Sequence, residues 1–202
     1  MTIANGYTTL AIVKARLGIA TADTADDTKM ETMVEGISRA IDGFCDRRFF
    51  VNGTDEVRYF TAPDRDELFA GDIVSLTSIA TDEDGDRVYE TAWGAGDWEL
   101  QPYNAALDGQ PYTMISTTPN GVYGFPSVAK GVKLTGKFGW SAVPAPVSEA
   151  CLLMTEKLFR RKDAIFGVVA SLEGGYLKQM IQDDPELKLL LGPYRWYNVL
   201  GT

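Results

Sequence analysis

The sequence predicts an α+β fold: a small helical bundle from the N- and C-terminal segments, with an antiparallel β insert between the second and third main helices. Apolar residues recur at helical spacing in residues 1–50 and 147–202, which we assign to the bundle and a C-terminal tail. Residues 51–146 instead alternate short β-branched or aromatic runs with turn residues, which is typical of strands. Charge follows the same division, because fourteen acidic and six basic residues give the insert −8 of the chain's net −9.

A short helix followed by a long helix is predicted at the N-terminus. One of the threonines at residues 8–9 can cap the first helix, and Gly18 can end it. One of the aspartates at residues 26–27 can cap the second, which we expect to end near residues 47–49. Its apolar positions predict one buried stripe: Met30, Met33, Val34, Ile37, Ala40, Ile41 and Phe44.

Six strands are predicted in the insert. They cover residues 56–60, 73–80, 87–90, 98–101, 112–116 and 132–140. The dipeptide Asp84-Gly85 lies between the second and third of these runs. It is typical of a two-residue hairpin turn, in which both central residues need positive φ.

Helical spacing returns after the Pro-Ala-Pro segment at residues 144–146. A further buried stripe is predicted at Val147, Ala150, Cys151, Met154, Leu158 and Phe159. Residues 167–175 are interpreted as a loop that ends in a Gly-Gly connector. A last short helix is expected to begin near residues 184–185, with proline in the first helical position, and to end at residues 192–193.

The composition excludes several classes of site. The chain has no histidine, which removes Ser-His-Asp and Cys-His catalysis, His-ligated zinc and His-ligated haem. Net acidity argues against binding nucleic acid by neutralising phosphates. Cys45 and Cys151 are far apart, so we expect two reduced, buried thiols, with a single disulfide as the alternative. No signal peptide or membrane-spanning run is visible, so we expect a soluble protein made in the cytoplasm that does not bind membranes.

Acidic residues are the remaining candidates for a metal or catalytic site. Residues 82–86 (Asp-Glu-Asp-Gly-Asp) fail the EF-hand pattern, because glycine falls at the fourth position and Trp93 stands where glutamate is required. We interpret them as an acidic turn. Paired carboxylates could serve a hydrolase, with Asp64, Asp66, Glu67, Asp72, Asp97 and Glu99 as candidates. Because surface carboxylates are abundant here, we expect no enzyme activity, no metal and no cofactor.

Two clusters are candidates for partner binding. Arg160, Arg161 and Lys162 close a predicted helix, where they either complement its dipole or contact DNA phosphates or a partner's carboxylates. The tail is rich in the residue types that dominate interfaces: Tyr194, Arg195, Trp196, Tyr197, Val199 and Leu200. This tail either folds back onto the chain's own core or docks onto another subunit.

The order of several segments forms a longer pattern. Residues 7–19 and the Asp-Asp pair at 26–27 precede residues 37–49, which end in Cys-Asp-Arg-Arg-Phe, and residues 131–147 and 189–195 follow. This order and spacing resemble the head–tail connector (adaptor) proteins of tailed bacteriophages, in their longer members that carry a β insert.

The resemblance implies a structural protein of the virion neck that is assembled in the host cytoplasm. Family members form a ring, usually of twelve copies, below the portal protein. That ring extends the channel through which genomic DNA passes without specific binding, and it is the platform for a stopper or tail-completion protein. Several members hold the portal with the C-terminal segment, which implies this role for residues 194–200. The alternatives are a tail-completion or stopper protein of the neck and a carboxylate-dependent hydrolase.

Overall fold

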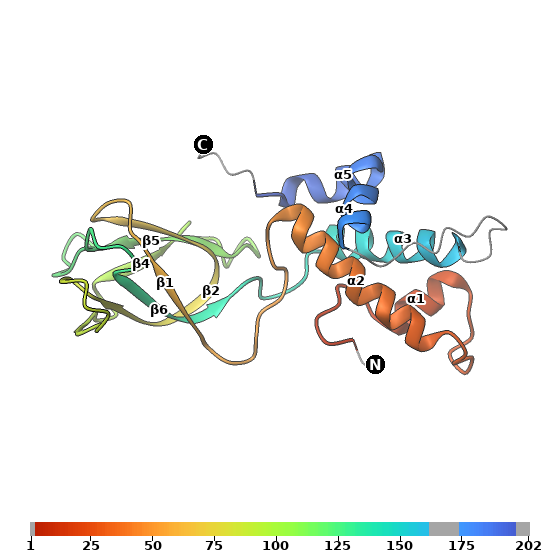
Figure 1. Cartoon of the computed structure of the whole chain (residues 1–202), viewed down its shortest axis with the longest axis horizontal. Helices are drawn as coiled ribbons and strands as arrows, with labels where there is room; N and C mark the ends of the chain where they lie inside the picture. Colours follow the sequence, from red (N-terminus) through yellow and green to blue (C-terminus); the bar gives the residue numbers. More distant parts are fainter. Residues whose placement is uncertain (1–2, 162–173, 197–202) are drawn as a thin grey trace. The chain divides into compact units, whose positions relative to one another are not determined.

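The computed structural model describes residues 3–161 and 174–196. The chain divides into two compact units (Figure 1): a helical unit within residues 1–49 and 143–202, and a β unit formed by residues 50–142. The architecture is α+β, with helices in one unit and an antiparallel sheet in the other, which confirms the predicted fold class.

The helical unit contains α-helices from both ends of the chain. In chain order they are α1 (Leu10–Leu17), α2 (Asp27–Cys45), α3 (Ala145–Arg161), α4 (Gly174–Asp183) and α5 (Pro185–Leu191), and a 3-10 turn, η1 (Gly192–Tyr194), follows. Helix α2 packs against α3 and α4, and α3 also contacts α1 and α5. None of the described helices is both long enough and apolar enough to cross a bilayer.

The N-terminal helices form where the sequence predicts, but the predicted aspartate cap of α2 was wrong, because Asp26 stands at the N-cap without a side-chain capping hydrogen bond. Thr9 caps α1, because its side chain accepts a hydrogen bond from the Ile12 amide, and Gly18 ends the helix with φ of 71°. All seven residues of the predicted stripe of α2 are buried. Helix α2 ends at Cys45, slightly earlier than expected, because Asp46 adopts a left-handed conformation with φ of 53°.

A buried lysine joins the first two helices. The Lys14 side chain is only 4% exposed, and its ammonium group is 2.8 Å from the Asp27 carboxylate. The same group donates to the carbonyl oxygens of Thr21 and Asp23, at 3.0 and 2.5 Å. A buried charge is tolerated only when it is paired and hydrogen-bonded, so Lys14 holds the loop between α1 and α2 in place.

One helix was missed at the C-terminal end. The residues of the predicted Gly-Gly connector begin α4, whose core positions Leu177 and Ile181 are fully buried one turn apart. The glycines weaken the local helical signal, and burial of this apolar pair compensates for their low propensity. Helix α5 begins as expected, since the Asp184 side chain accepts hydrogen bonds from the Glu186 and Leu187 amides.

The β unit is an antiparallel sheet of six strands. They are β1 (Glu56–Phe60), β2 (Glu67–Thr81), β3 (Thr91–Ala92), β4 (Trp98–Gln101), β5 (Tyr112–Thr117) and β6 (Val132–Phe138). The strand order is β1-β6-β2-β5-β4, and the short β3 pairs with the end of β2. Two predictions were wrong: β2 begins six residues before the expected Ile73, and residues 87–90 form no strand.

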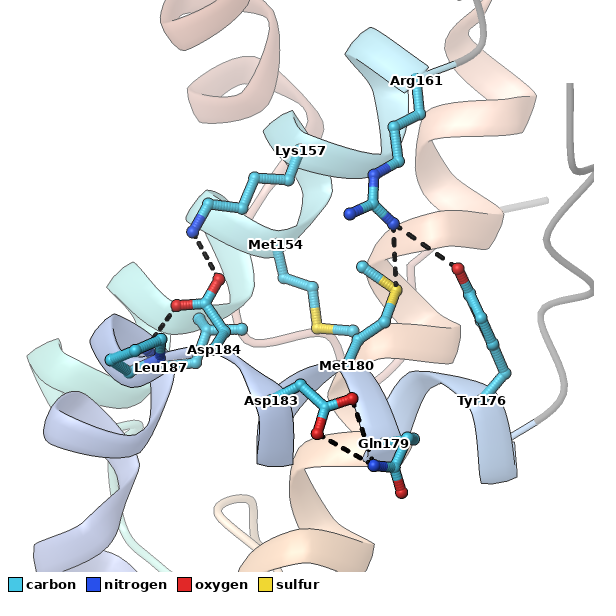
Figure 2. Close-up of a pocket in the computed structure, with 10 residues that line it drawn as sticks. Met154, Lys157, Arg161, Tyr176, Gln179, Met180, Asp183, Asp184 and Leu187 are labelled. Carbon is cyan, nitrogen blue, oxygen red and sulfur yellow. Dashed lines mark hydrogen bonds and ion pairs between the residues drawn. The ribbon is translucent and has the colours of Figure 1, made fainter. Parts of the chain in front are cut away.

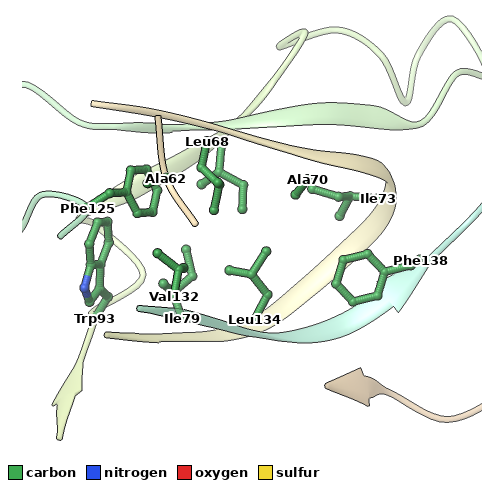
Figure 3. Close-up of a cluster of buried hydrophobic side chains, with 11 residues drawn as sticks. Ala62, Leu68, Ala70, Ile73, Ile79, Trp93, Phe125, Val132, Leu134 and Phe138 are labelled. Carbon is green, nitrogen blue, oxygen red and sulfur yellow. The ribbon is translucent and has the colours of Figure 1, made fainter. Parts of the chain in front are cut away.

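The sheet folds over a single core. The first part of β2 pairs with β5 and its second part with β6, and the register shifts between Phe69 and Ile73, where Gly71 has φ of 74°. Strands β2, β5 and β4 therefore form one layer, and β2, β6 and β1 form the other. Figure 3 shows buried side chains of both layers facing each other, with Leu68 and Ala70 opposite Leu134 and Ile79.

Candidate interaction surfaces

The described part of the tail packs against the C-terminal end of α2. The Trp196 amide donates a hydrogen bond to the Cys45 carbonyl oxygen at 2.7 Å, which occupies one of the carbonyls that a helix end leaves unpaired. The Arg47 guanidinium lies 4.7 Å from the centroid of the Trp196 ring, and the Arg195 guanidinium lies 5.2 Å from that of Phe44. These cation–π contacts hold Arg195 and Trp196, the base of the tail, against their own chain.

A row of three aromatic rings continues from this contact into the core. The Phe49 ring meets Tyr194 edge-on with centroids 5.9 Å apart, and it meets Tyr7 edge-on at 5.7 Å. The Phe49 side chain is fully buried, and its amide donates to the Tyr7 hydroxyl oxygen at 3.0 Å. The row thus joins the N-terminal segment, the end of α2 and the tail.

Tyr7 also brings a carboxylate into this cluster. The Tyr7 hydroxyl donates to Asp42, which forms an ion pair with Arg39 at 3.3 Å. Burial raises the pKa of the Asp42 carboxyl to about 6, although the Tyr7 hydrogen bond and the Arg39 charge oppose the rise. The cluster therefore contains a carboxyl whose pKa is raised toward neutrality.

The described part of the tail folds back onto the chain's own core, which is the first of the two alternatives. Tyr194, Arg195 and Trp196 contact the chain's own helix α2 and Phe49. Tyr197, Val199 and Leu200 lie outside the described residues. Binding of the tail to another subunit stays a prediction.

The basic cluster at the end of α3 is partly engaged within the helical unit. Arg160 pairs with Glu156 one turn earlier at 2.9 Å, and Arg16 of α1 reaches the same carboxylate at 3.0 Å. These two hydrogen-bonding arginines lower the pKa of Glu156. The Arg161 guanidinium approaches the hydroxyl of Tyr176 at 3.5 Å, and Lys162 lies outside the described residues.

A pocket of about 430 Å³ opens beside Arg161, between α3, α4 and α5 (Figure 2). Its walls include Met154, Met180 and Asp183. The positive charge of Lys157 is already paired, because its ammonium group is 2.6 Å from the Asp184 carboxylate. The hydrogen bond to Asp184 raises the pKa of Lys157 and lowers that of Asp184, so the pair stays ionised at neutral pH. The pocket therefore offers no strongly unbalanced charge to a ligand.

The acidic segment predicted as a turn forms a longer loop. Strands β2 and β3 pair through Thr81 and Thr91, so residues 82–90 connect them. Positive φ occurs at Gly85 and Arg87 but not at Asp84, so the predicted two-residue turn was wrong. A buried aspartate accepts hydrogen bonds from two backbone amides of this loop.

Asp82 is that aspartate. It is fully buried, and its carboxylate accepts hydrogen bonds from the amides of Gly85 at 2.6 Å and Arg87 at 3.0 Å. Burial, the largest single influence, raises the pKa of Asp82, but the two amides, the charge of Arg87 and the Asp84 side chain together outweigh it, so the pKa lies below its ordinary value. Single carboxylate oxygens of Asp82, Asp84 and Asp86 lie within 4.8 Å of one another. Since the oxygens of Asp82 already bind backbone amides, the group is explained by loop structure.

Two of the other candidate carboxylates, Asp64 and Asp97, also bind nearby backbone amides. Asp64 accepts from the amides of Asp66 and Glu67, each at 2.8 Å. Asp97 accepts from Gly94 at 2.8 Å and from Val122 at 3.0 Å. Two further candidates accept side-chain donors: Asp72 binds the Trp140 indole at 3.1 Å, and Glu99 binds Gln101 at 3.1 Å. These groups stabilise turns and strand ends of the β unit.

Both cysteines are buried free thiols, which confirms the first of the two alternatives. Burial raises the pKa of Cys45 to about 12 and that of Cys151 to about 11, so both are protonated at neutral pH.

Sequence reasoning missed the ion pairs that organise the surfaces of the helical unit, such as Arg16 with Glu156 and Lys157 with Asp184. Each pair joins residues distant in sequence, and no local pattern identifies them.

No family model and no curated protein matches the chain. Solved structures do resemble it. A chain from the neck of an empty gene transfer agent (GTA) particle, computed with C6 symmetry, has a TM-score of 0.60 and 17% identity, and the match covers 100% of this chain and 96% of that one. A chain from the neck of a native GTA particle, computed with C12 symmetry, has a TM-score of 0.58 and 19% identity, with 96% and 91% covered. The chain therefore has the fold of proteins from the necks of GTA particles.

Proposed function

We propose that the chain is a structural head–tail connector (adaptor) that forms a ring in the neck of a tailed phage or phage-like particle. The observation that carries this proposal is the length of the structural match, which covers 100% of this chain and 96% of a chain from a particle neck. Both units therefore take part in the similarity. The C6 and C12 symmetries of those necks favour a ring of identical copies.

The charge distribution suits a neck through which DNA moves. The β unit has six basic and fourteen acidic residues, so it attracts phosphate weakly if at all. Each Lys or Arg contact with DNA would add attraction that slows passage. In this proposal genomic DNA passes without specific binding, and the ring binds the portal on one side and a stopper or tail-completion protein on the other.

The tail is the proposed portal-binding segment. Tyr194, Arg195 and Trp196 fix its base on α2, and residues 197–202 follow this anchor with three further apolar or aromatic residues. The anchor suggests two truncations with different consequences. A chain that ends at Trp196 keeps the contacts with α2, whereas a chain that ends at Gly192 loses them.

We expect both truncated chains to lose co-sedimentation with purified portal, while only the shorter one loses thermal stability. The matched pair separates loss of binding from loss of folding. If the chain that ends at Trp196 co-sediments with portal as the full chain does, residues 197–202 are not the portal-binding segment.

Electron microscopy of the chain mixed with portal tests the proposed function as a whole. A ring of copies seated directly on the portal is the expected result. Copies that bind only after another neck protein has joined the portal would identify a stopper or tail-completion protein instead. A chain found in neither complex, and absent from the necks of particles labelled with an antibody against it, would overturn the proposal.

A further inference from the structure

The two layers of the β unit have outer faces of opposite charge. Side chains alternate along each strand, so the residues between the buried ones point away from the core. Because the buried residues of the two layers face each other (Figure 3), the outer faces lie on opposite sides of the β unit. The two faces differ sharply in composition.

The outer face of β1 and β6 is basic and aromatic. Lys133 and Lys137 alternate with buried residues of β6, and they are the only charged residues of that strand. On β1, Tyr59 pairs with Lys133 and Val57 with Thr135, and these two side chains are 52% and 49% exposed. Tyr89 extends this face, with its ring centroid 5.4 Å from that of Tyr59. We call this set the basic face.

The outer face of the other layer is acidic. Glu67 of β2 and Glu99 of β4 both pair with Ser116 of β5, one from each side, so the two carboxylates flank it. The next row contains Phe69, which is 51% exposed, beside Met114. No basic residue occurs on the strands of this layer: Glu67 to Ile73, Trp98–Gln101 and Tyr112–Thr117. We call this set the acidic face.

We infer that the basic face of one copy binds the acidic face of the next copy. The inference rests on the proposed ring. A ring requires two different, complementary surfaces on each copy, because identical patches generate a closed dimer instead. Here each face combines exposed apolar or aromatic side chains with charges of one sign, and the partner face supplies the opposite sign.

Charge complementarity favours a second copy of this chain as the partner of the basic face. The β unit as a whole carries −8, so a second copy is itself a strongly acidic partner that a lysine-bearing face attracts. Since the faces lie on opposite sides, each copy can contact two neighbours at once.

Paired charge reversals test the contact. The basic-face variant is Lys133→Glu with Lys137→Glu, and the acidic-face variant is Glu67→Lys with Glu99→Lys. Self-association of each full-length chain is measured by sedimentation velocity over a concentration series, with circular dichroism and thermal melting as checks of folding. Lys29→Glu with Lys188→Glu, two exposed lysines of the helical unit, is the control for net charge.

Each face variant alone should associate at least about tenfold more weakly than the wild type, because like charges then meet across the contact. An equimolar mixture of the two should recover wild-type association, since the reversed face of one matches the reversed face of the other in an alternating ring. The control should stay within about twofold of the wild type. Wild-type association in both separate variants, or a mixture as weak as its components, would overturn the inference.

A second measurement needs no variant. A carbodiimide, which joins a lysine amine to a nearby carboxylate as an amide, is applied to a mixture of isotopically light and heavy wild-type chains. Mass spectrometry should find mixed-isotope cross-links from Lys133 or Lys137 to Glu67 or Glu99. Oligomers that are cross-linked only through other residues would overturn the inferred contact while leaving a neck location intact. A chain missing from the neck would instead overturn the proposed function alone.

Discussion

The two units place a buried carboxylate in opposite environments. In the helical unit, Asp42 meets a tyrosine hydroxyl and burial dominates, so its pKa rises to about 6. In the β unit, Asp82 meets two backbone amides and its pKa falls. Burial alone therefore does not set the charge of an acidic residue. Donors aimed at the ionised form decide it.

The units also differ in what joins their parts. The helical unit depends on side chains that connect distant segments, such as Phe49 between Tyr7 and Tyr194. The β unit depends on a backbone ladder, with aspartates that stabilise its loops. Substitutions should therefore act mainly through lost packing in the first unit and through backbone strain or lost loop structure in the second.

The largest expected effect is that of Phe49→Ala. This fully buried ring contacts two other rings, so its removal should lower the free energy of unfolding of the helical unit by about 3–5 kcal/mol. Chemical denaturation followed by circular dichroism at 222 nm measures the change. Leu189→Ala, at a side chain that is 79% exposed, is the control and should change stability by less than about 0.5 kcal/mol. Equal effects of both substitutions would contradict the aromatic row.

The pH dependence of the helical unit should come next in size. Between the ordinary pKa of 3.8 and the folded value of about 6, folded Asp42 holds a proton that the unfolded chain has released. Stability should therefore fall as pH rises from about 4 to about 6, by roughly 1–3 kcal/mol. Asp42→Asn should remove this contribution to the slope. Denaturation at a series of pH values measures it, and an unchanged slope in the variant would refute the assignment.

Asp82 should give the stability of the β unit a pH dependence of the opposite sign. Its folded pKa lies below the ordinary value, so its stabilisation is present near neutral pH and is lost as pH falls through the acidic range. Three of the four tryptophans, Trp93, Trp98 and Trp140, lie in the β unit. Tryptophan emission of a Trp196→Phe chain therefore reports this unit alone. Asp82→Asn should weaken the loss on acidification, and a steeper loss in the variant would contradict the role of the two amides.

Gly136→Ala should disturb the backbone pairing of the β unit. A Cβ at residue 136 would lie 2.3 Å from the Ser75 carbonyl oxygen and 2.9 Å from the Leu76 Cα, both backbone atoms. The strand cannot relax without shifting the β2–β6 pairing, so we expect a loss of about 1–3 kcal/mol in denaturation followed by tryptophan emission. At Gly53 a Cβ meets no atom within 4 Å, so Gly53→Ala is the matched control and should be nearly neutral. A tolerated Gly136→Ala would show that the ladder is more adaptable than proposed.

The smallest expected effect concerns the base of the tail. The Arg47 guanidinium over the Trp196 ring should contribute about 0.5–1 kcal/mol. A double-mutant cycle with Arg47→Ala and Trp196→Ala measures this coupling through the free energy of unfolding. Additive single effects would mean that the tail is held by the Trp196 backbone hydrogen bond and the Tyr194 ring instead.

Local patterns determined much of the fold. The stripe of α2, the capping of α1 and α5, and the bounds of β1 and β4 follow from periodicity and from capping residues, which involve neighbours in the sequence. The same reasoning missed α4, because its two initial glycines conceal a helix that burial of Leu177 and Ile181 stabilises.

Composition and periodicity were enough to predict the α+β class, the concentration of acidity in residues 51–146 and the two unpaired thiols. Only contacts made in the folded chain shift the pKa values of Asp42 and Asp82 in opposite directions and place the start of the tail on α2. The same is true of the strand register that puts Lys133 and Lys137 on the opposite face from Glu67 and Glu99. The physical reason is that composition and periodicity arise within short segments. Hydrogen-bond partners, burial and strand register instead depend on contacts between segments far apart in the chain, and those contacts exist only after folding.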